Sequence, residues 1–181
     1  MDDVKNYSTL KSLVEDMQKN ADKLGIKGVF ASTSLKTGED WRWQTHLLNI
    51  PLYYEFKKDQ NTNPTLSLLE ANEIEYKYYK NFENIFDLYV NNSVTAKTLL
   101  GSKSVADSMA EFALGKAAMV QNGNWAWSQI NNVKGNVVKA ENVKYLPIYM
   151  GIEGEENQGL CIGTENFFAI NSKATKEEQK A

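Results

Sequence analysis

Two tryptophans follow a predicted tight turn at residues 122–124, Asn-Gly-Asn. The turn residues tolerate positive φ angles, and Trp125 and Trp127 come directly after them. An indole has a flat apolar face whose natural partner is another flat apolar face. Trp125, Trp127 and the neighbouring Asn124 are therefore candidate ligand contacts. The spacing alone favours a core role for the two tryptophans equally, because Trp is highly buried on average.

A second group of candidate ligand contacts lies at residues 39–43, Glu-Asp-Trp-Arg-Trp. Trp41 offers a flat face, and Glu39 and Arg42 offer planar charged groups that pair with hydroxyls. Such pairing matters because a hydroxyl buried without a partner costs about 1–3 kcal/mol. We therefore predict ligand contacts for Glu39, Trp41 and Arg42, and a core position for Trp43. In the alternative interpretation, Asp40 or Glu39 caps the following helix by its favourable charge at the N-terminus.

The elements that must position Trp125 are a helix and a short strand. Apolar residues at helical spacing continue to Ala113, and Gly115 is typical of a helix C-cap, so the helix is predicted to end there. Residues 117–120, Ala-Ala-Met-Val, have the length and apolar character of a buried strand. In an open α/β sheet, the carboxyl ends of strands form the ligand crevices. The pattern thus predicts Trp125 at such an edge.

The second group is positioned by an earlier helix and strand. Apolar spacing predicts a helix over residues 9–24, which Gly25 ends, and then a strand over residues 28–32. A polar loop over residues 33–40 follows this strand. Glu39 and its neighbours are therefore expected beside the same sheet edge as Trp125.

The middle of the chain is predicted to be helical with one polar break. A helix is expected from Trp43, interrupted at Pro51 because proline has no N–H to donate to the preceding turn. The polar residues 57–65 predict a surface loop. Aromatic and aliphatic residues at helical spacing from Tyr76 to Val90 predict a long helix that Asn91-Asn92 ends. Such a stripe is more typical of packing than of a ligand platform.

Residues 112–130, F-A-L-G-K-A-A-M-V-Q-N-G-N-W-A-W-S-Q-I, resemble a segment of the extracellular solute-binding proteins of carbohydrate ABC transporters, of the maltose-binding type. In that family a helix ends in F-x-x-G-K-x-A-M, a strand follows, and a G-x-W turn presents a sugar-stacking tryptophan. A weaker likeness continues through residues 145–147 and 168–172, and back to residues 7–10. The resemblance implies an α/β fold: one lobe of a periplasmic-binding-protein-like two-lobed fold, with a sheet flanked by helices.

The resemblance also implies roles for single residues. Trp125 falls on the stacking position of the family, and Trp127 on an aromatic that more often packs. Glu39 and Trp41 fall on a Glu and an aromatic two residues later in the corresponding loop. The implied function is capture of a mono- or oligosaccharide outside the cytoplasmic membrane, without catalysis or a cofactor, and delivery to the permease of an ABC transporter.

Two other classes of function stay open. A glycoside hydrolase fragment would need two carboxylates about 5–10 Å apart across a cleft. Glu39 and Asp40 are adjacent in sequence, and no partner is evident in the other loop. A non-catalytic protein-interaction scaffold would use the tyrosine-rich helix Tyr76–Tyr89 as an exposed interface. A concave face shared by Trp41 and Trp125 would favour the sugar site over both.

Composition narrows the choice of partner. The chain has 181 residues, of which 42% are hydrophobic and 24% charged, enough for one well-buried domain. A net charge of −3 without a basic cluster makes nucleic acid or an anionic membrane an unsuitable partner. The lone Cys161 excludes an internal disulfide. The lone His46, without a neighbouring ligand, argues against a metal or catalytic site and favours a solvated or hydrogen-bonded histidine.

The two ends of the chain suggest a piece of a longer protein. Residues 1–20 lack the features of a signal peptide, and no apolar run approaches a membrane span, so we expect export by a signal outside this chain and membrane contact only through an outside anchor. Thr175 and Glu178 form a predicted capping box just before Ala181. Residues 1–181 are therefore expected to be a single lobe, with the other lobe and the C-terminal helices absent. The glutamate-rich residues 151–159 are expected to form a mobile connection.

Overall fold

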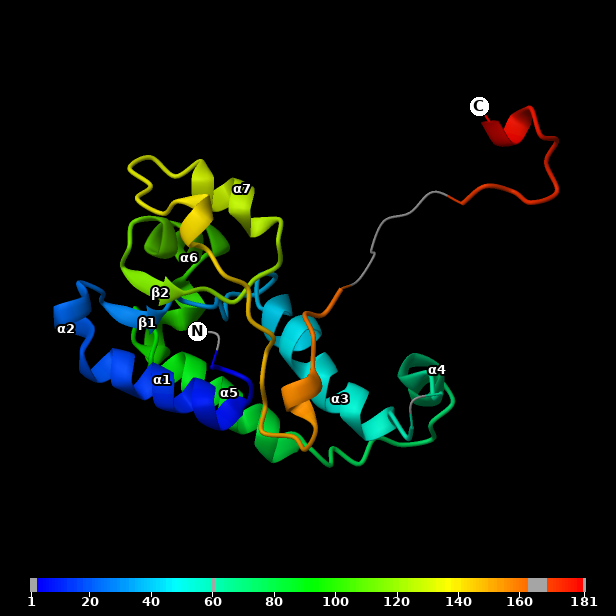
Figure 1. The fold of residues 1–181 in the computed structure, drawn as a ribbon, viewed down its shortest axis with the longest axis horizontal. Coiled ribbons are helices and arrows are strands. Elements are labelled where there is room, and N and C mark those ends of the chain that lie inside the picture. The colour runs from blue at the N-terminus through cyan, green and yellow to red at the C-terminus, as the bar shows by residue number, and fades with distance from the viewer. Residues whose placement is uncertain (1–2, 60, 163–168, 181) are drawn as a thin grey trace.

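The computed structural model describes residues 3–59, 61–162 and 169–180. Helices surround a small parallel sheet (Figure 1). The helices and strands are α1 (Tyr7–Lys19), α2 (Ala21–Leu24), β1 (Gly28–Phe30), α3 (Asn49–Phe56), α4 (Pro64–Leu69), α5 (Tyr79–Asn91), α6 (Val105–Ala113), β2 (Ala117–Met119) and α7 (Ala126–Asn131). A π-helix, η1 (Arg42–Leu48), precedes α3, and short 3₁₀ turns are η2 (Lys97–Ser102), η3 (Ala140–Asn142), η4 (Glu155–Asn157) and η5 (Glu178–Lys180).

The sheet brings together two segments far apart in the sequence. β1 and β2 run parallel, with Gly28 opposite Ala117 and Phe30 opposite Met119. A single bridge adds Ser93 beside Phe30. The sheet lies between α1 and α5 on one side and α6 and α7 on the other (Figure 1). This arrangement confirms the predicted α/β lobe and both predicted strands, each somewhat shorter than expected.

The first predicted helix is confirmed, with one break. Asn6 caps α1 by accepting a hydrogen bond from the Thr9 backbone N–H at 2.9 Å. The helix breaks at Asn20, continues as α2, and ends at Gly25. Gly25 has φ 70°, a left-handed conformation that glycine adopts without a Cβ penalty. The predicted stop is therefore correct in position and in cause.

The main core joins α1, β1, η1 and α5 with a later segment of irregular chain. Burial of this apolar surface is the main favourable term in folding. The aromatic helix α5 contributes a buried stripe, as predicted, while Tyr76 and Tyr79 before and at its start are exposed. The buried members are Val4, Leu10, Val14, Val29, Phe30, Trp43, Leu47, Ile85, Leu88, Tyr89, Val90, Leu100, Tyr149, Met150 and Ile152.

Two prolines behave differently from the prediction. Pro51 does not interrupt the helix but lies buried in the first turn of α3. The helix runs on without a break from η1 into α3, and the proline, which has no N–H to donate, lies just after this change of helix type. Pro64 does not lie in a loop: it opens α4, and Asn63 caps it by accepting from the N–H of Leu66 at 3.2 Å. The polar loop therefore ends earlier than expected.

A second, smaller core positions the Trp125 segment. It consists of Met109, Ala113, Ala126 and Ile130, which join α6 to α7. α6 ends as predicted at Gly115, whose φ is 67°. Because α6, β2 and α7 follow one another closely and share this core, the turn that precedes Trp125 is held by packing on both sides.

The glutamate-rich segment is anchored, contrary to the expectation of a mobile connection. The Glu155 side chain is buried, and its carboxylate accepts backbone hydrogen bonds from Tyr7 at 2.6 Å, Met150 at 2.6 Å and Gly151 at 2.8 Å. Tyr7 is the first residue of α1, so this carboxylate also complements the positive end of that helix. Glu155 thus ties residues 148–158 to the start of the domain.

The predicted capping box near the end of the chain is confirmed. The Thr175 N–H donates to Glu178 Oε2 at 2.9 Å, and the Glu178 N–H donates to Thr175 Oγ1 at 3.3 Å. Residues 163–168, where part of the weaker sequence likeness lies, are outside the described residues. Among the described helices, none is long and apolar enough to cross a membrane.

Candidate functional site

The π-helix η1 begins immediately after Trp41 and presents the second predicted group. Trp43 and Leu47 anchor it in the main core, and the Trp43 indole N–H donates to the Ser34 carbonyl at 3.1 Å. The core position predicted for Trp43 is confirmed. The Thr45 hydroxyl donates to the Trp41 carbonyl at 2.9 Å, which satisfies an acceptor at the start of this turn.

The wide turn of η1 places His46 against Trp41. The two ring centroids are 5.0 Å apart, with the planes at 89°. In an α-helix, residues five apart lie about 140° apart around the axis and do not meet. The i→i+5 hydrogen bond of a π-helix closes the turn over five residues instead, and such turns are frequent at functional sites. The π-helical turn is therefore the local cause of this ring contact.

Trp125 completes a group of three rings, the ring triad Trp41, His46 and Trp125. Its indole centroid lies 6.2 Å from that of Trp41, with an interplanar angle of 34°, and 5.6 Å from that of His46. The Trp125 side chain is 44% exposed and that of Trp41 is half-buried. The structure thus joins the two groups of residues that the sequence separates by more than 80 positions.

The turn before Trp125 needs glycine for a reason that differs from the expected one. None of residues 122–124 has a positive φ. Instead, a Cβ on Gly123 would lie 2.2 Å from the Trp125 ring, a distance no side chain tolerates. The absence of a side chain at Gly123 therefore lets the indole fold back over the turn.

Asn124 and Trp127 occupy different surroundings. Asn124 is exposed beside Trp125, and its backbone carbonyl accepts from the Trp127 N–H at 3.3 Å. Trp127 is half-buried and packs against the second core. Trp127 is outside the ring triad, and its contacts are those of a packing residue.

Arg42 is buried and packs against the Trp41 ring. Its guanidinium carbon lies 4.1 Å from the centroid of the Trp41 ring, a cation–π distance. The side chain is only 5% exposed, and burial lowers the pKa of the guanidinium because it disfavours the charged form, while nearby Glu39 opposes that shift. Its one assigned hydrogen bond is a long one of 3.5 Å to the Glu39 carbonyl, and Nε has no partner.

Glu39 caps a helix, although not the one that follows it. Its carboxylate accepts from the N–H of Val105, the first residue of α6, and forms an ion pair of 3.5 Å with Lys36. The alternative of a cap on the following helix is wrong, because no side chain of the described residues caps η1 by a hydrogen bond and the helix that Glu39 caps begins 66 residues away. A ligand contact for Glu39 stays a prediction, and it would compete with these bonds.

Gln121 is a residue that the sequence analysis did not single out. It lies two residues after the end of β2, and its Nε2 lies 2.8 Å from His46 Nδ1. Gln121 is 8% exposed, and its other amide atom, Oε1, is buried without a hydrogen-bond partner. Its place in the sequence could have identified it, because Gln121 is the polar residue that follows the predicted strand 117–120. Such a residue lies at the carboxyl edge of the sheet, where α/β folds present ligand contacts. For His46, the expected hydrogen-bonded state is confirmed.

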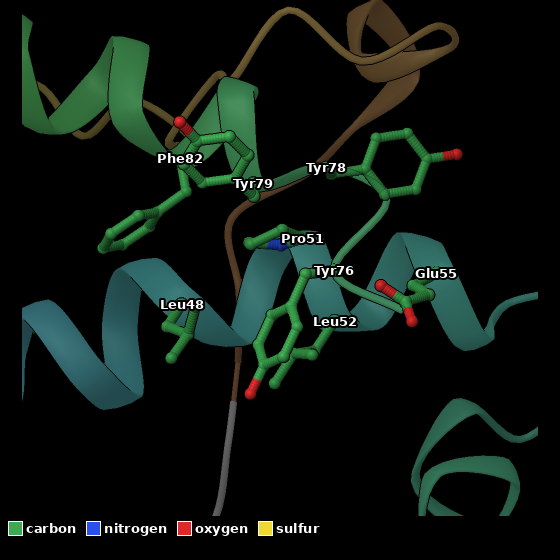
Figure 2. Close-up of a pocket in the computed structure, with 8 residues that line it drawn as sticks. All are labelled: Leu48, Pro51, Leu52, Glu55, Tyr76, Tyr78, Tyr79 and Phe82. Atoms are coloured by element: carbon green, nitrogen blue, oxygen red, sulfur yellow. The ribbon is translucent and has the colours of Figure 1, made fainter. Parts of the chain in front are cut away.

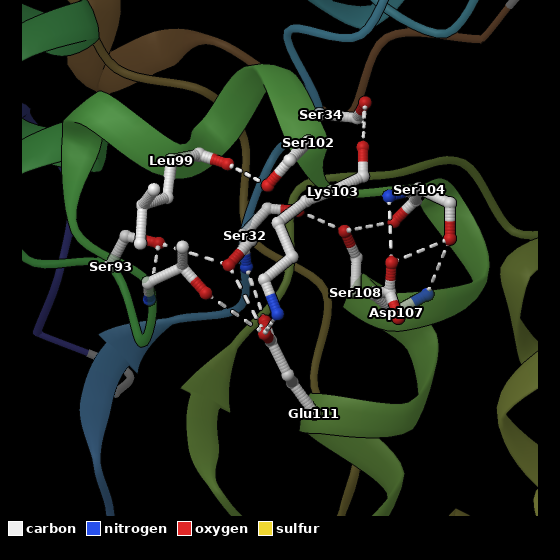
Figure 3. Close-up of polar contacts among 11 residues, drawn as sticks. Ser32, Ser34, Ser93, Leu99, Ser102, Lys103, Ser104, Asp107, Ser108 and Glu111 are labelled. Carbon is white, nitrogen blue, oxygen red and sulfur yellow. Dashed lines mark hydrogen bonds and ion pairs between the residues drawn. The ribbon is translucent and has the colours of Figure 1, made fainter.

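A buried polar network joins the chain after β1 to α6 (Figure 3). The Glu111 carboxylate, on α6, accepts from the Ser32 N–H at 2.8 Å and from the Thr95 hydroxyl at 3.2 Å. Lys103 Nζ lies 3.6 Å from Glu111 Oε1, which gives the buried charge a partner. Ser32 follows β1, so the network ties the chain leading to Trp41 onto α6. Its contacts are internal, which suits a structural role.

A small apolar cavity lies away from the ring triad, between α3 and the start of α5 (Figure 2). Its volume is about 90 Å³, and its lining residues are Leu48, Pro51, Leu52, Glu55, Tyr76, Tyr78, Tyr79 and Phe82. The Glu55 carboxylate accepts from the N–H groups of Glu75 at 2.8 Å and Lys77 at 3.0 Å. These bonds hold the chain around Tyr76, which has a φ of 56°. The Glu55 carboxylate thus holds in place the segment that carries Tyr76.

No metal-binding cluster of three or more His, Cys, Asp or Glu occurs in the part of the chain that the structure describes.

The whole chain, residues 1–181, matches the family model of bacterial extracellular solute-binding proteins. The chain therefore belongs to the bacterial extracellular solute-binding protein family, and its α/β lobe agrees with that membership. Its role is that of a ligand-binding component for an ABC transporter, in a family that is extracellular or periplasmic and generally non-catalytic. Comparisons with curated proteins and with solved structures returned no match.

Proposed function

We propose that this chain is the lobe of an extracellular binding protein that captures a mono- or oligosaccharide on Trp41 and Trp125 for delivery to the permease of an ABC transporter. The observation on which this rests is the pairing of the two indoles, 6.2 Å apart, one of them 44% exposed. A sugar ring has an apolar C–H face that suits an indole and hydroxyls at its rim that need partners. An aromatic surface bordered by polar groups offers both.

The separation of the two indoles restricts how a sugar would bind. A ring sandwiched between them would need van der Waals gaps of about 3.5–4.0 Å on each side, or about 7–8 Å in all. The observed 6.2 Å is too short for that. The ligand is therefore expected to lie across the exposed side of the pair, or to separate the rings on binding. In a two-lobed protein, hinge closure over such a surface would complete the site.

A screen for stabilisation of the chain tests the proposal. A ligand that binds only the folded state raises the unfolding temperature, by an amount set by its concentration relative to Kd. The panel is glucose, maltose, maltotriose, sucrose and raffinose, each at 10 mM, followed by calorimetric titration of the sugar with the largest shift. Stabilisation by at least one sugar, lost in Trp125→Ala and kept in Tyr79→Ala, is the expected result. Tyr79 is the matched control because it is an exposed aromatic outside the ring triad, at the cavity between α3 and α5.

Two results would refute the sugar assignment. If no panel sugar stabilises the chain while amino acids or peptides do, the solute belongs to another class. If a sugar binds equally well to Trp125→Ala, the indole pair is not its site.

A further inference from the structure

We propose that His46 and Gln121 belong to the ligand site, with Gln121 acting as a positioning residue through the imidazole and with a ring hydroxyl of the sugar as their target. The inference rests on the proposed function, because it takes the indole pair as the ligand surface. It goes beyond that function by assigning a part of the site to two residues that neither the sequence motifs nor family membership singles out.

The ring contacts make His46 the residue that connects the two indoles. Its ring centroid lies 5.0 Å from that of Trp41, in an edge-on contact, and 5.6 Å from that of Trp125. The centroids of the two indoles are 6.2 Å apart. Aromatic pairs in tilted or edge-to-face arrangements at these distances attract one another by about 0.5–1.5 kcal/mol beyond area burial. A shift of the imidazole would therefore change both contacts at once. The position of His46 therefore sets how the rings of the ring triad are arranged.

The Gln121 amide is the group that fixes the imidazole. Its Nε2 lies 2.8 Å from His46 Nδ1, and more than nine-tenths of the residue is buried, so the amide has little freedom to move away. β2 and the second core hold the chain on either side of Gln121, and η1 holds His46. The hydrogen bond thus joins two independently anchored elements at a member of the ring triad.

Two buried polar atoms in residues that contact the ring triad lack hydrogen-bond partners. Gln121 Oε1 and Arg42 Nε are the buried side-chain atoms without a hydrogen bond among the described residues. An unpartnered buried polar atom costs about 1–3 kcal/mol, so native structures keep few of them. Both belong to residues in contact with the ring triad: Gln121 with His46, and Arg42 with Trp41. That both residues with an unpaired atom contact members of the ring triad indicates a site built to receive a polar group.

The chemical class of the ligand follows from these two features together. The indoles would contact an apolar ring face. Once the rings separate on binding, the buried acceptor oxygen of Gln121 and the guanidinium N–H of Arg42 would complement a hydroxyl, which both donates and accepts. A site that hydrogen-bonds a hydroxyl rejects analogues lacking it much more strongly than a purely apolar surface would. We therefore expect discrimination against the corresponding deoxy sugar.

A measurement without ligand tests the positioning role. Coupled indoles give an exciton signal in circular dichroism, and Trp125→Phe defines the part that comes from the pair. In Gln121→Met, which keeps the size of the side chain but removes the hydrogen bond, this part should fall by at least half. It should be retained in Gln121→Glu, whose carboxylate still bonds an imidazole N–H. His46→Phe, which keeps a ring but not the hydrogen bond, is a second test and should resemble Gln121→Met.

Binding of the best panel sugar tests the ligand role separately. Gln121→Met should weaken its affinity by about tenfold or more, and Gln121→Glu by less than threefold. An unchanged exciton signal in both Gln121→Met and His46→Phe overturns the positioning role. A changed signal with unchanged sugar affinity overturns the assignment to the ligand site. If no panel sugar binds the unaltered chain, the proposed function fails, and with it the ligand part of this inference, while the dichroism still decides the positioning part.

Discussion

The Trp125 indole folds back so closely over Gly123 that a Cβ at that glycine would lie 2.2 Å from the ring. The glycine thus does not serve a left-handed turn: it leaves space for an aromatic ring that is also 44% exposed. The free protein thus already places this exposed ring in the space that Gly123 leaves. Such a ring is preorganised for contact, since ordering it on binding would cost little further entropy.

The first prediction concerns Gly123→Ala. The added methyl must push the indole away, and the exposed ring can move, so the free energy of unfolding should fall by no more than about 1 kcal/mol. The ring triad should nevertheless open, with loss of the Trp41–Trp125 exciton signal and at least a tenfold loss of sugar affinity. Circular dichroism and calorimetry check this. Gly101→Ala is the control, because a Cβ there meets nothing within 4 Å. Unchanged dichroism in Gly123→Ala would contradict the role given to this glycine.

The second prediction concerns the accessibility of the tryptophans. Iodide should quench Trp125 emission, because this indole is 44% exposed, and should hardly reach Trp43, which is 5% exposed. Quenching should therefore fall substantially in Trp125→Phe and stay almost the same in Trp43→Phe. Stern–Volmer analysis of both variants makes the comparison. Equal quenching of Trp125→Phe and the unaltered chain would mean that the indole is covered in solution.

The third prediction concerns the anchor at Glu155. Its buried carboxylate accepts three backbone hydrogen bonds, from Tyr7, Met150 and Gly151. Glu155→Gln replaces one acceptor oxygen by an amide group that faces an N–H donor, so the free energy of unfolding should fall by about 2–3 kcal/mol. Denaturant titration measures the change.

Glu156→Gln is the matched control for that experiment. Glu156 is exposed in the same turn, and its one assigned hydrogen bond is to the neighbouring Asn157 side chain. The control should change stability by less than about 0.5 kcal/mol. If the two variants behave alike, the Glu155 contacts do not stabilise the domain.

The fourth prediction concerns the pH dependence of the start of α6. The Ser104 N–H and hydroxyl both bond the Asp107 carboxylate, which lowers the pKa of Asp107 below its ordinary value of 3.8. A depressed folded-state pKa contributes stability above the unfolded-state pKa that is lost as the pH falls through the folded value. The cap should therefore persist at pH 4 and be lost only at lower pH.

An NMR titration of the Asp107 carboxyl carbon checks this. Ser104→Ala removes the hydroxyl donor, so the Asp107 pKa should rise toward 3.8. An Asp107 pKa at or above 3.8 in the unaltered chain would show that the capping box does not form in solution.

Much of the fold follows from local patterns in the sequence. Gly25 and Gly115 end helices because each adopts a left-handed conformation next to an apolar helical repeat, and both were predicted. Strands β1 and β2 follow from short apolar runs, and the Thr175–Glu178 capping box from a spacing of three residues. These features depend on residues within one or two turns of each other, where identity and spacing are sufficient.

The composition of the candidate site depended instead on contacts between distant residues. Sequence alone pointed to Trp41 and Trp125, but not to their contact with each other through His46, because that contact needs both the parallel pairing of β1 with β2 and a π-helical turn. Glu39 capping α6 is equally beyond local reasoning, since its partner is 66 residues away. Local spacing determines where helices and strands begin and end, whereas packing between them decides which side chains meet, and only the second assembles a site.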